Sequence, residues 1–231
     1  MEMATAPVIL EGIVGSTAYG LATATSDVDK LGVKLLPNRH FLGLETPSEG
    51  SLSQVTTDPD TTYHDIGKYC RLALTCNPTA MELMWLPNYT KTTDVGEWLI
   101  DNRMSFISAE KVRNSFMGYA SSQFKRLSER QHSFSSDTKN RTQKHARHLL
   151  RLMHQGYTLY TTGVLPIQLE DPQRYHEFGA LVEANPNHAR QTLEEYTRMF
   201  DLATPVIPLE ADRELVDHFV FGVRSGMWEF I

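Results

Sequence analysis

The order of apolar and polar residues predicts three strands in the first third of the chain. Residues 8–14 form a largely apolar run of strand-forming residues, as expected of a buried strand. From Lys30 to Leu35 polar and apolar residues alternate, which predicts a strand over 27–36 with one buried face. A segment rich in β-branched and aromatic residues predicts a further strand over 60–66.

The pattern changes to helical periodicity in the second part of the chain. A first helix is predicted over 68–75, and Asn77 followed by Pro78 is typical of the start of another. Further on, the pattern predicts a short strand over 165–169 and helices over 94–104, 109–130, 141–162, 187–202 and 210–230. We therefore expect an α+β fold, in which residues 1–92 form a core with a small mixed β-sheet and flanking helices. Residues 93–231 would form a C-terminal helical region packed on that core.

Composition and charge exclude several classes of protein. The chain has 231 residues, of which 41% are hydrophobic, and a net charge of −6. No apolar stretch approaches the roughly 20 residues of a membrane helix, and the first residues lack the basic end and apolar core of a signal peptide. The two cysteines and nine histidines show no zinc-ligand spacing, which makes a zinc hydrolase a poor fit. We expect a cytoplasmic protein with buried thiols.

The strongest chemical pattern follows the first predicted strand. It reads Gly15-Ser16-Thr17-Ala18-Tyr19-Gly20, then Ser26-Asp27-Val28-Asp29. The glycines allow sharp turns around a short helical segment, and a turn that opens a helix presents backbone N–H groups to a phosphate. Asp27 and Asp29 lie two apart, hence on one face of the second strand, in phase with its apolar residues. Such carboxylates are costly there without compensation, and they are ligands that Mg²⁺ prefers. Either motif alone is common, but their order and distance favour metal-assisted chemistry on a polyphosphate.

At these residues the sequence resembles the polymerase-beta nucleotidyltransferase superfamily. The pattern of that superfamily is an apolar strand, Gly-Ser or Gly-Gly, a short helix, and then Asp-x-Asp or Asp-x-Glu. The sequence is most similar to the bacterial and phage nucleotidyltransferase family associated with RNA repair. The residues that carry this resemblance are Gly15-Ser16-x-Ala18-Tyr19-Gly20, Ser26-Asp27-x-Asp29, Gly32-Val33, Asn77-Pro78-Thr79, Glu82-Leu83, Lys144, His148, Arg151-Leu152 and Gly163. They extend from the first predicted strand to about residue 169, and the resemblance fades after that.

The resemblance implies a site for two Mg²⁺ ions, with Mn²⁺ as an alternative, and a nucleoside triphosphate as substrate. Asp27 and Asp29 would bind the ions together with a third carboxylate from a separate strand. Of the candidates Asp58, Asp60 and Asp65, we choose Asp60, because it opens the predicted third strand. Asp65 would point to the opposite face and suits the start of a helix, and it is kept as the alternative.

The resemblance also implies the nucleotide-binding residues. Those near the first strand are Gly15, Ser16, Tyr19 and Ser26, and the loop over 44–59 is considered as a flap over the nucleotide. In the predicted helix over 141–162, Lys144, His148 and Arg151 are spaced at i, i+4 and i+7 and therefore share one face. By the resemblance this face would bind the triphosphate.

A local surplus of positive charge surrounds that helix. Residues 125–151 contain eight lysines and arginines against only Glu129 and Asp137. The stretch is interpreted equally well as a solvated helix face or as a wall that binds phosphates, including those of an RNA or DNA acceptor.

The predicted function is the Mg-dependent transfer of a nucleoside monophosphate from a nucleoside triphosphate to an acceptor hydroxyl, with release of pyrophosphate. An RNA or DNA end is the expected acceptor, in the cytoplasm, or in the host cytoplasm if the chain is phage-encoded. Two alternatives stay open: an adenylyltransferase that modifies a protein or small molecule, which the negative net charge favours, and a non-catalytic nucleotide-binding module. The sequence does not give the oligomeric state.

Overall fold

The computed structural model describes residues 3–24, 26–44, 46–129 and 136–227. These residues form two compact units. Residues 1–108 and 210–231 make the first unit, and residues 109–209 make the second. The sequence analysis instead drew its boundary at residue 92 and assigned everything after it to one helical region. In the structure, residues 93–108 and the C-terminal segment belong with the sheet.

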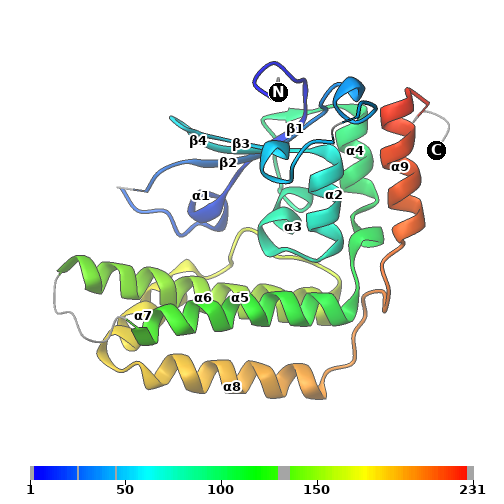
Figure 1. The fold of residues 1–231 in the computed structure, drawn as a ribbon. Helices are drawn as coiled ribbons and strands as arrows, with labels where there is room; N and C mark the ends of the chain where they lie inside the picture. Colours follow the sequence, from blue (N-terminus) through cyan, green and yellow to red (C-terminus); the bar gives the residue numbers. More distant parts are fainter. Residues whose placement is uncertain (1–2, 25, 45, 130–135, 228–231) are drawn as a thin grey trace. The chain divides into compact units, whose positions relative to one another are not determined.

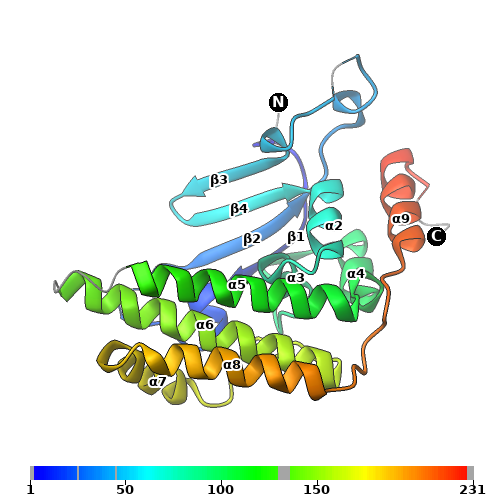
Figure 2. The ribbon, with the colours of Figure 1, turned by 60° about the horizontal axis from the view of Figure 1, so that its bottom comes forward.

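The first unit is built on a five-stranded mixed sheet, which confirms the α+β expectation. Its order is β3-β4-β2-β1-β5, and Figure 2 shows the first four of these strands side by side. The strands are β1 (Val8–Val14), β2 (Asp29–Lys34), β3 (Ser53–Thr57), β4 (Asp60–Asp65) and β5 (Lys91–Thr92). Only β2 and β4 run parallel to each other, and the other neighbours are antiparallel.

Strand β1 has the predicted bounds, whereas β2 is shorter than the predicted 27–36. The pairing of the two strands explains the difference. Asp29 pairs with Val14, the last residue of β1, and Gly15 then turns the chain away with a φ of 70°. Because no partner strand continues beyond this pair, Asp27 lies in the loop before β2 and not in the strand itself.

Short helices cover one face of the sheet (Figure 1). They are α2 (Ile66–Leu74), α3 (Pro78–Met84) and α4 (Asp94–Asp101), followed by the 3₁₀ helix η3 (Arg103–Phe106). Asn77 caps α3 as predicted, accepting from the backbone N–H groups of Thr79 and Ala80 at 3.0 and 3.2 Å. This helix and the residues after it pack on β1, since a Cβ added to Gly12 would meet the side chain of Leu83 at 3.7 Å and that of Leu86 at 2.2 Å.

The C-terminal helix α9 (Arg213–Ser225) belongs to this same unit. It is shorter than the predicted 210–230, and the residues after 227 lie outside the described part of the chain. Phe219 is fully buried and stacks on Trp98 of α4, with ring centroids 3.7 Å apart and planes inclined by 5°. The last described helix therefore completes the hydrophobic core that begins with β1.

The loop over 37–52 is attached to its neighbours by specific contacts. It contains the 3₁₀ helices η1 (Asn38–His40) and η2 (Gly50–Leu52). Glu49 forms an ion pair with Arg71 of α2, and its carbonyl oxygen accepts from Lys68 at 2.7 Å. Asn38 donates to the carbonyl oxygen of Arg224 in α9. These contacts tie the loop to α2 and α9. Of the segment over 44–59 that was considered as a flap, residues 53–57 form strand β3 of the sheet.

The second unit is helical. It consists of α5 (Ala109–Glu129), α6 (Ser136–Thr162), α7 (Pro172–Ala184) and α8 (Asn187–Leu202). Side-chain contacts join α6 to each of the others. His145 bonds Gln123 of α5, Gln143 bonds Glu183 of α7, and Tyr157 packs edge-on against Phe200 of α8.

Two predictions for this unit were wrong. The sequence analysis missed α7, and the short strand over 165–169 does not form. Leu165, Ile167 and Leu169 are each at most 3% exposed, so their alternation does reflect burial. The backbone there has no strand partner, and the Pro166 carbonyl oxygen instead accepts from the side chain of Gln155 at 2.7 Å. Across the described residues, no helix is both long and apolar enough to cross a membrane.

Candidate nucleotidyltransferase site

The turn from β1 into α1 (Gly15–Tyr19) forms the centre of the candidate site. Gly15 adopts the left-handed conformation, with φ of 70°, and Gly20 ends the helix in the same conformation. Val14 stands at the N-cap position, and its side chain makes no cap hydrogen bond. The first backbone N–H groups of α1 thus begin at a residue that bears no side chain, as in turns that hold a phosphate.

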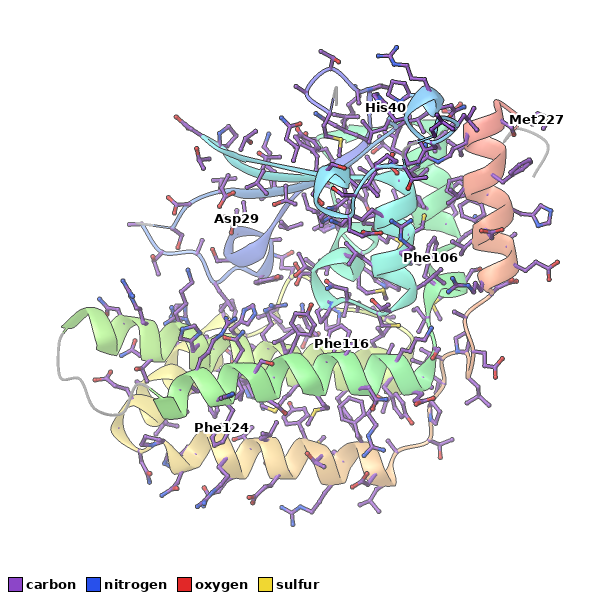
Figure 3. All side chains as sticks on the ribbon, in the orientation of Figure 1. Asp29, His40, Phe106, Phe116, Phe124 and Met227 are labelled. Carbon is purple, nitrogen blue, oxygen red and sulfur yellow. The ribbon has the colours of Figure 1, made fainter. Side chains whose placement is uncertain are left out.

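Asp29 lies directly against this turn. A Cβ added to Gly15 would stand 2.5 Å from Oδ2 of Asp29, a distance at which atoms overlap. Figure 3 shows Asp29 beside α1. The structure therefore brings together two residues that the sequence motif places 14 positions apart, a glycine backbone and a carboxylate. Glycine is the residue type that leaves room for this contact.

Ser26 and Asp27 lie in the loop that connects α1 to β2. The backbone N–H of Ser26 donates to the carbonyl oxygen of Thr23 at 3.0 Å, and Ser26 Oγ accepts from the N–H of Thr23 at 2.9 Å. This pair of bonds closes the loop just before Asp27. Asp27 itself is exposed, whereas Asp29 is half-buried. The two predicted metal ligands thus differ in their exposure to solvent.

Asp60 stands level with Asp29 on the neighbouring strand. Lys30 of β2 pairs with Thr61 of β4, so the residues before them, Asp29 and Asp60, occupy corresponding positions at the same end of two parallel strands. Side chains alternate between the faces of a sheet, and both aspartates therefore belong to the face opposite Lys30 and Thr61. This register favours Asp60 as the third carboxylate.

Asp65 has a different environment from Asp60. It is fully buried at the other end of β4 and forms the N-cap of α2. One carboxylate oxygen accepts from the N–H of Leu36 at 3.2 Å, and the other accepts from the N–H of Gly67 at 3.0 Å and from Arg224 at 2.5 Å. Its oxygens are thus occupied by three protein donors, which identifies Asp65 as a structural carboxylate.

The carboxylates fit a divalent cation by their chemistry. Carboxylate oxygens are the ligands of Mg²⁺, and the space beside Asp29 is one that a Cβ on Gly15 would fill. Within the described residues, no three His, Cys, Asp or Glu side chains converge closely enough to hold a metal ion by themselves. Binding of Mg²⁺ by Asp27, Asp29 and Asp60 stays a prediction.

Tyr19 belongs to the core of the first unit. It is 5% exposed, at the end of α1. Its burial is that of a core residue, and its predicted part in binding the nucleotide stays a prediction. The neighbouring Ser16 is half-buried, and its carbonyl oxygen accepts from the N–H of Leu21 at 2.9 Å, which ties the end of the turn back to its start.

The three residues of the predicted stripe on α6 differ in exposure. Lys144 is exposed, His148 is half-buried, and Arg151 is only 2% exposed. Arg151 donates to Gln155 and lies 3.2 Å from Nδ1 of His148. Gln155 in turn donates to the Pro166 carbonyl oxygen. Arg151 thus takes part in a buried network of the second unit, a role that the i, i+4, i+7 spacing did not predict.

Positive charge surrounds His148. Its pKa is lowered to about 3, chiefly by burial and also by the nearby charges of Arg151, His145, Lys144 and Arg126. His148 is therefore neutral at physiological pH. Arg126 comes from α5 and shows that the basic surface extends over two helices of this unit, whereas Arg130, in the same basic stretch, lies outside the described residues.

The other face of the sheet carries a polar cluster that the sequence analysis missed. Glu11 of β1 accepts from Tyr63 of β4 and from Thr90, and Lys30 lies 3.5 Å away. Burial alone would raise the pKa of Glu11, but these hydrogen bonds and the charge of Lys30 outweigh it and the pKa falls. Lys30 is thereby paired on the face opposite Asp29, so it does not neutralise that carboxylate.

A glycine turn that opens a short helix after the first strand, with an aspartate from the second strand against it on a mixed sheet, is the arrangement of a nucleotidyltransferase core of the polymerase-beta type. The family model RlaP, described as the RNA repair pathway DNA polymerase beta family, matches residues 1–203, and the chain belongs to this family. Membership supports a nucleotidyltransferase-type function. No curated protein matches the chain.

Proposed function

We propose that this protein transfers a nucleoside monophosphate from a nucleoside triphosphate to the terminal hydroxyl of an RNA or DNA acceptor. In this reaction the acceptor oxygen forms a bond to the α-phosphorus, the bond from that phosphorus to the pyrophosphate oxygen breaks, and the hydroxyl proton is released. The single observation that carries the proposal is the contact between the carboxylate of Asp29 and the backbone of Gly15.

The chain's own residues position the substrate. The backbone N–H groups of Gly15 and Ser16 face the phosphates, and the closed loop at Ser26 sets the start of β2. Phosphoryl transfer needs little covalent help, so orientation and charge neutralisation account for most of the rate. Carboxylates are negatively charged and therefore cannot neutralise the charge of the phosphates without a bound cation.

Asp27, Asp29 and Asp60 would hold Mg²⁺ or Mn²⁺, which when bound neutralises phosphate charge and lowers the pKa of the attacking hydroxyl. The family membership and the shared level of Asp29 and Asp60 support this assignment. In the second unit, Lys144 would bind a phosphate as a point charge, and the neutral His148 would offer a hydrogen bond without adding charge. Arg151 would hold the ring of His148 in place.

The acceptor is proposed from the family description and from the basic surface. The family name includes RNA repair, and Arg126, Lys144 and the partly buried Arg147 lie on α5 and α6. A second candidate is transfer to a protein or small molecule, which the net charge of −6 and the burial of Arg151 favour. Binding of a nucleic-acid acceptor would weaken steeply as the salt concentration rises, whereas binding of a small neutral acceptor would not.

The test is the transfer of label from α-³²P nucleoside triphosphates, in Mg²⁺ or Mn²⁺, to an RNA, a DNA and the protein itself. We expect wild type to label the RNA, and Asp29→Asn and Asp60→Asn each to abolish the label. Asp101→Asn is the matched control, because Asp101 is an exposed carboxylate at the end of α4. Equal labelling by all four proteins would refute the assigned site, and label only in protein would favour the second candidate.

A further inference from the structure

The side chain of Arg224 joins the ends of the two strands that begin with candidate metal ligands. Strands β2 and β4 start at Asp29 and Asp60 and end at Lys34 and Asp65. Beyond their ends, Arg224 of α9 donates to the carboxylate of Asp65 at 2.5 Å and to the carbonyl oxygen of Leu36 at 3.4 Å.

At this junction Asp65 is buried and Arg224 is partly buried. Asp65 also accepts from the N–H of Leu36, so the carboxylate, the guanidinium and the Leu36 peptide contact one another in a ring. The guanidinium lies 3.8 Å from the centre of the Phe41 ring, and Asn38 donates to the carbonyl oxygen of Arg224. The planar guanidinium presents donors in a fixed geometry to both strand ends at once, a geometry that the single point charge of a lysine does not supply.

Strand β4 is held in the sheet by its two neighbouring strands and by the hydrogen bond from Tyr63 to Glu11 of β1. It meets β2 over five residue pairs, from Lys30 with Thr61 to Lys34 with Asp65, and its other neighbour is its own hairpin partner β3. The strands β3 and β4 therefore form a ribbon at the edge of the sheet, and parallel pairing is the weaker kind. Asp60 stands at the hairpin end of this ribbon, and Asp65 at the end that Arg224 holds.

The length of β4 turns a small rotation at one end into a large displacement at the other. Five residues of strand span about 16 Å, so a rotation of about 4° at Asp65 moves Asp60 by about 1 Å. A misplacement of this size in a catalytic group costs about 100-fold in rate. The alignment of Asp60 with Asp29 thus depends on how firmly the far ends of their strands are joined.

We propose that Arg224 is a positioning residue of the nucleotidyltransferase site, which keeps Asp60 level with Asp29 by holding the ends of β2 and β4 together. The proposal rests on the proposed function insofar as it concerns catalysis. It also assigns a role to α9, which lies beyond residues 1–203 that the family model matches.

The test compares Arg224→Ala and Arg224→Lys with two control variants of α9. Arg213→Ala removes an exposed arginine from the same helix, and Phe219→Leu loosens the helix at its stacking contact with Trp98, away from the strand ends. Each protein is assayed for transfer across a Mn²⁺ titration, at a temperature where circular dichroism shows it fully folded. A purely structural role would lower the melting temperature and leave the Mn²⁺ dependence of the folded enzyme unchanged.

We expect Arg224→Ala to lower kcat by about 10- to 100-fold, to raise the Mn²⁺ concentration for half-maximal rate, and to leave KM for the nucleotide within a few-fold. Arg224→Lys should lie between this variant and wild type, and it serves alone if Arg224→Ala does not fold. Both controls should match wild type. Unchanged Mn²⁺ dependence in the Arg224 variants, or an equal change in Phe219→Leu, overturns the proposal.

Hydrogen exchange separates a failure of this proposal from a failure of the proposed function. If wild type transfers no nucleotide, the proposed function fails, and exchange of the amides of residues 60–65 then decides the role of Arg224. Faster exchange over these residues in Arg224→Ala, but not in Phe219→Leu, supports the role in strand alignment. Equal exchange in both variants and in wild type overturns it.

Discussion

The carboxylate of Asp29 occupies the place where a side chain on Gly15 would stand: the two would be 2.5 Å apart. Replacing Gly15 by alanine therefore either displaces Asp29 or opens the turn, and the left-handed backbone adds about 1–2 kcal/mol of strain. We expect Gly15→Ala to lower nucleotidyl transfer by about 100-fold, the cost of moving a catalytic group by about 1 Å. Single-turnover transfer of α-labelled nucleotide measures this loss.

Gly226→Ala is the control for the backbone strain. Gly226 has a φ of 74°, close to that of Gly15, and a Cβ added to it meets nothing within 4 Å. It should lose about 1 kcal/mol of stability and keep its activity. Full activity in Gly15→Ala would show that the contact with Asp29 has no part in catalysis.

The packing of α5 against α6 gives a prediction about stability alone. A Cβ on Gly156 would stand 2.5 Å from the Cβ of Phe116, an overlap that the fully buried ring cannot relieve by rotating away. Gly156→Ala should therefore destabilise the second unit by about 1–3 kcal/mol. In Gly118→Ala the new methyl group meets nothing within 4 Å, and the helix should gain about 0.5–1 kcal/mol. Urea unfolding of both variants checks the pair, and a loss in both would contradict the assigned packing.

His148 gives the second unit a dependence on pH. Its pKa is about 3 in the folded protein, chiefly because of burial, and about 6.5 when unfolded. Between these values the unfolded chain binds a proton that the folded protein does not, so the free energy of unfolding falls as pH drops below about 6.5, by up to about 1.4 kcal/mol per pH unit. Above that pH the histidine is neutral in both states and contributes no slope.

The measurement compares wild type with His148→Gln between pH 5 and 6.5, a window above the titration of most carboxylates. His148→Gln keeps a polar side chain that does not titrate, and its unfolding free energy should depend less on pH. His40→Gln is a useful control, since His40 lies in the first unit. Identical slopes in wild type and His148→Gln would exclude the buried, neutral histidine.

Two ion pairs involve residues at opposite ends of α2, and their different burial predicts different contributions to stability. Asp65, whose side chain is 1% exposed, pairs with Arg224, and Asp65→Asn leaves that arginine without its charge partner. We expect a loss of about 3–5 kcal/mol. Glu49 and Arg71 are both at least half exposed, and Glu49→Gln should cost less than about 1 kcal/mol. Thermal unfolding distinguishes the two, and a small effect of Asp65→Asn would show that the guanidinium is compensated elsewhere.

Local patterns in the sequence predicted the parts of the fold that depend on neighbouring residues. Strand β1 and the Asn77 cap were predicted correctly because apolar runs and capping side chains act within a few positions. The segment over 165–169 has the alternation of a strand but lacks a partner, and no local pattern shows whether a partner exists. Strand pairing is decided by residues that are distant in the sequence.

Local patterns in the sequence likewise predicted only part of the candidate site. The sequence motif placed Gly15 and Asp29 in one site, and their contact agrees with it. The sequence favoured Asp60 over Asp65 by its place at the start of a strand, and the register of β4 on β2 adds that Asp60 lies level with Asp29. Nothing in the sequence indicated that Asp65 pairs with Arg224, because the two are 159 positions apart.

That separation has a consequence for synthesis of the chain. At ribosomal rates of about 5–20 residues per second, Asp65 leaves the ribosome roughly 10–30 s before Arg224 does. The helical second unit ends at residue 209 and is therefore complete before Arg224 emerges, while the sheet unit still lacks the cation for a carboxylate that it must bury. The interrupted unit therefore reaches its final form after the uninterrupted one, although most of it is made first.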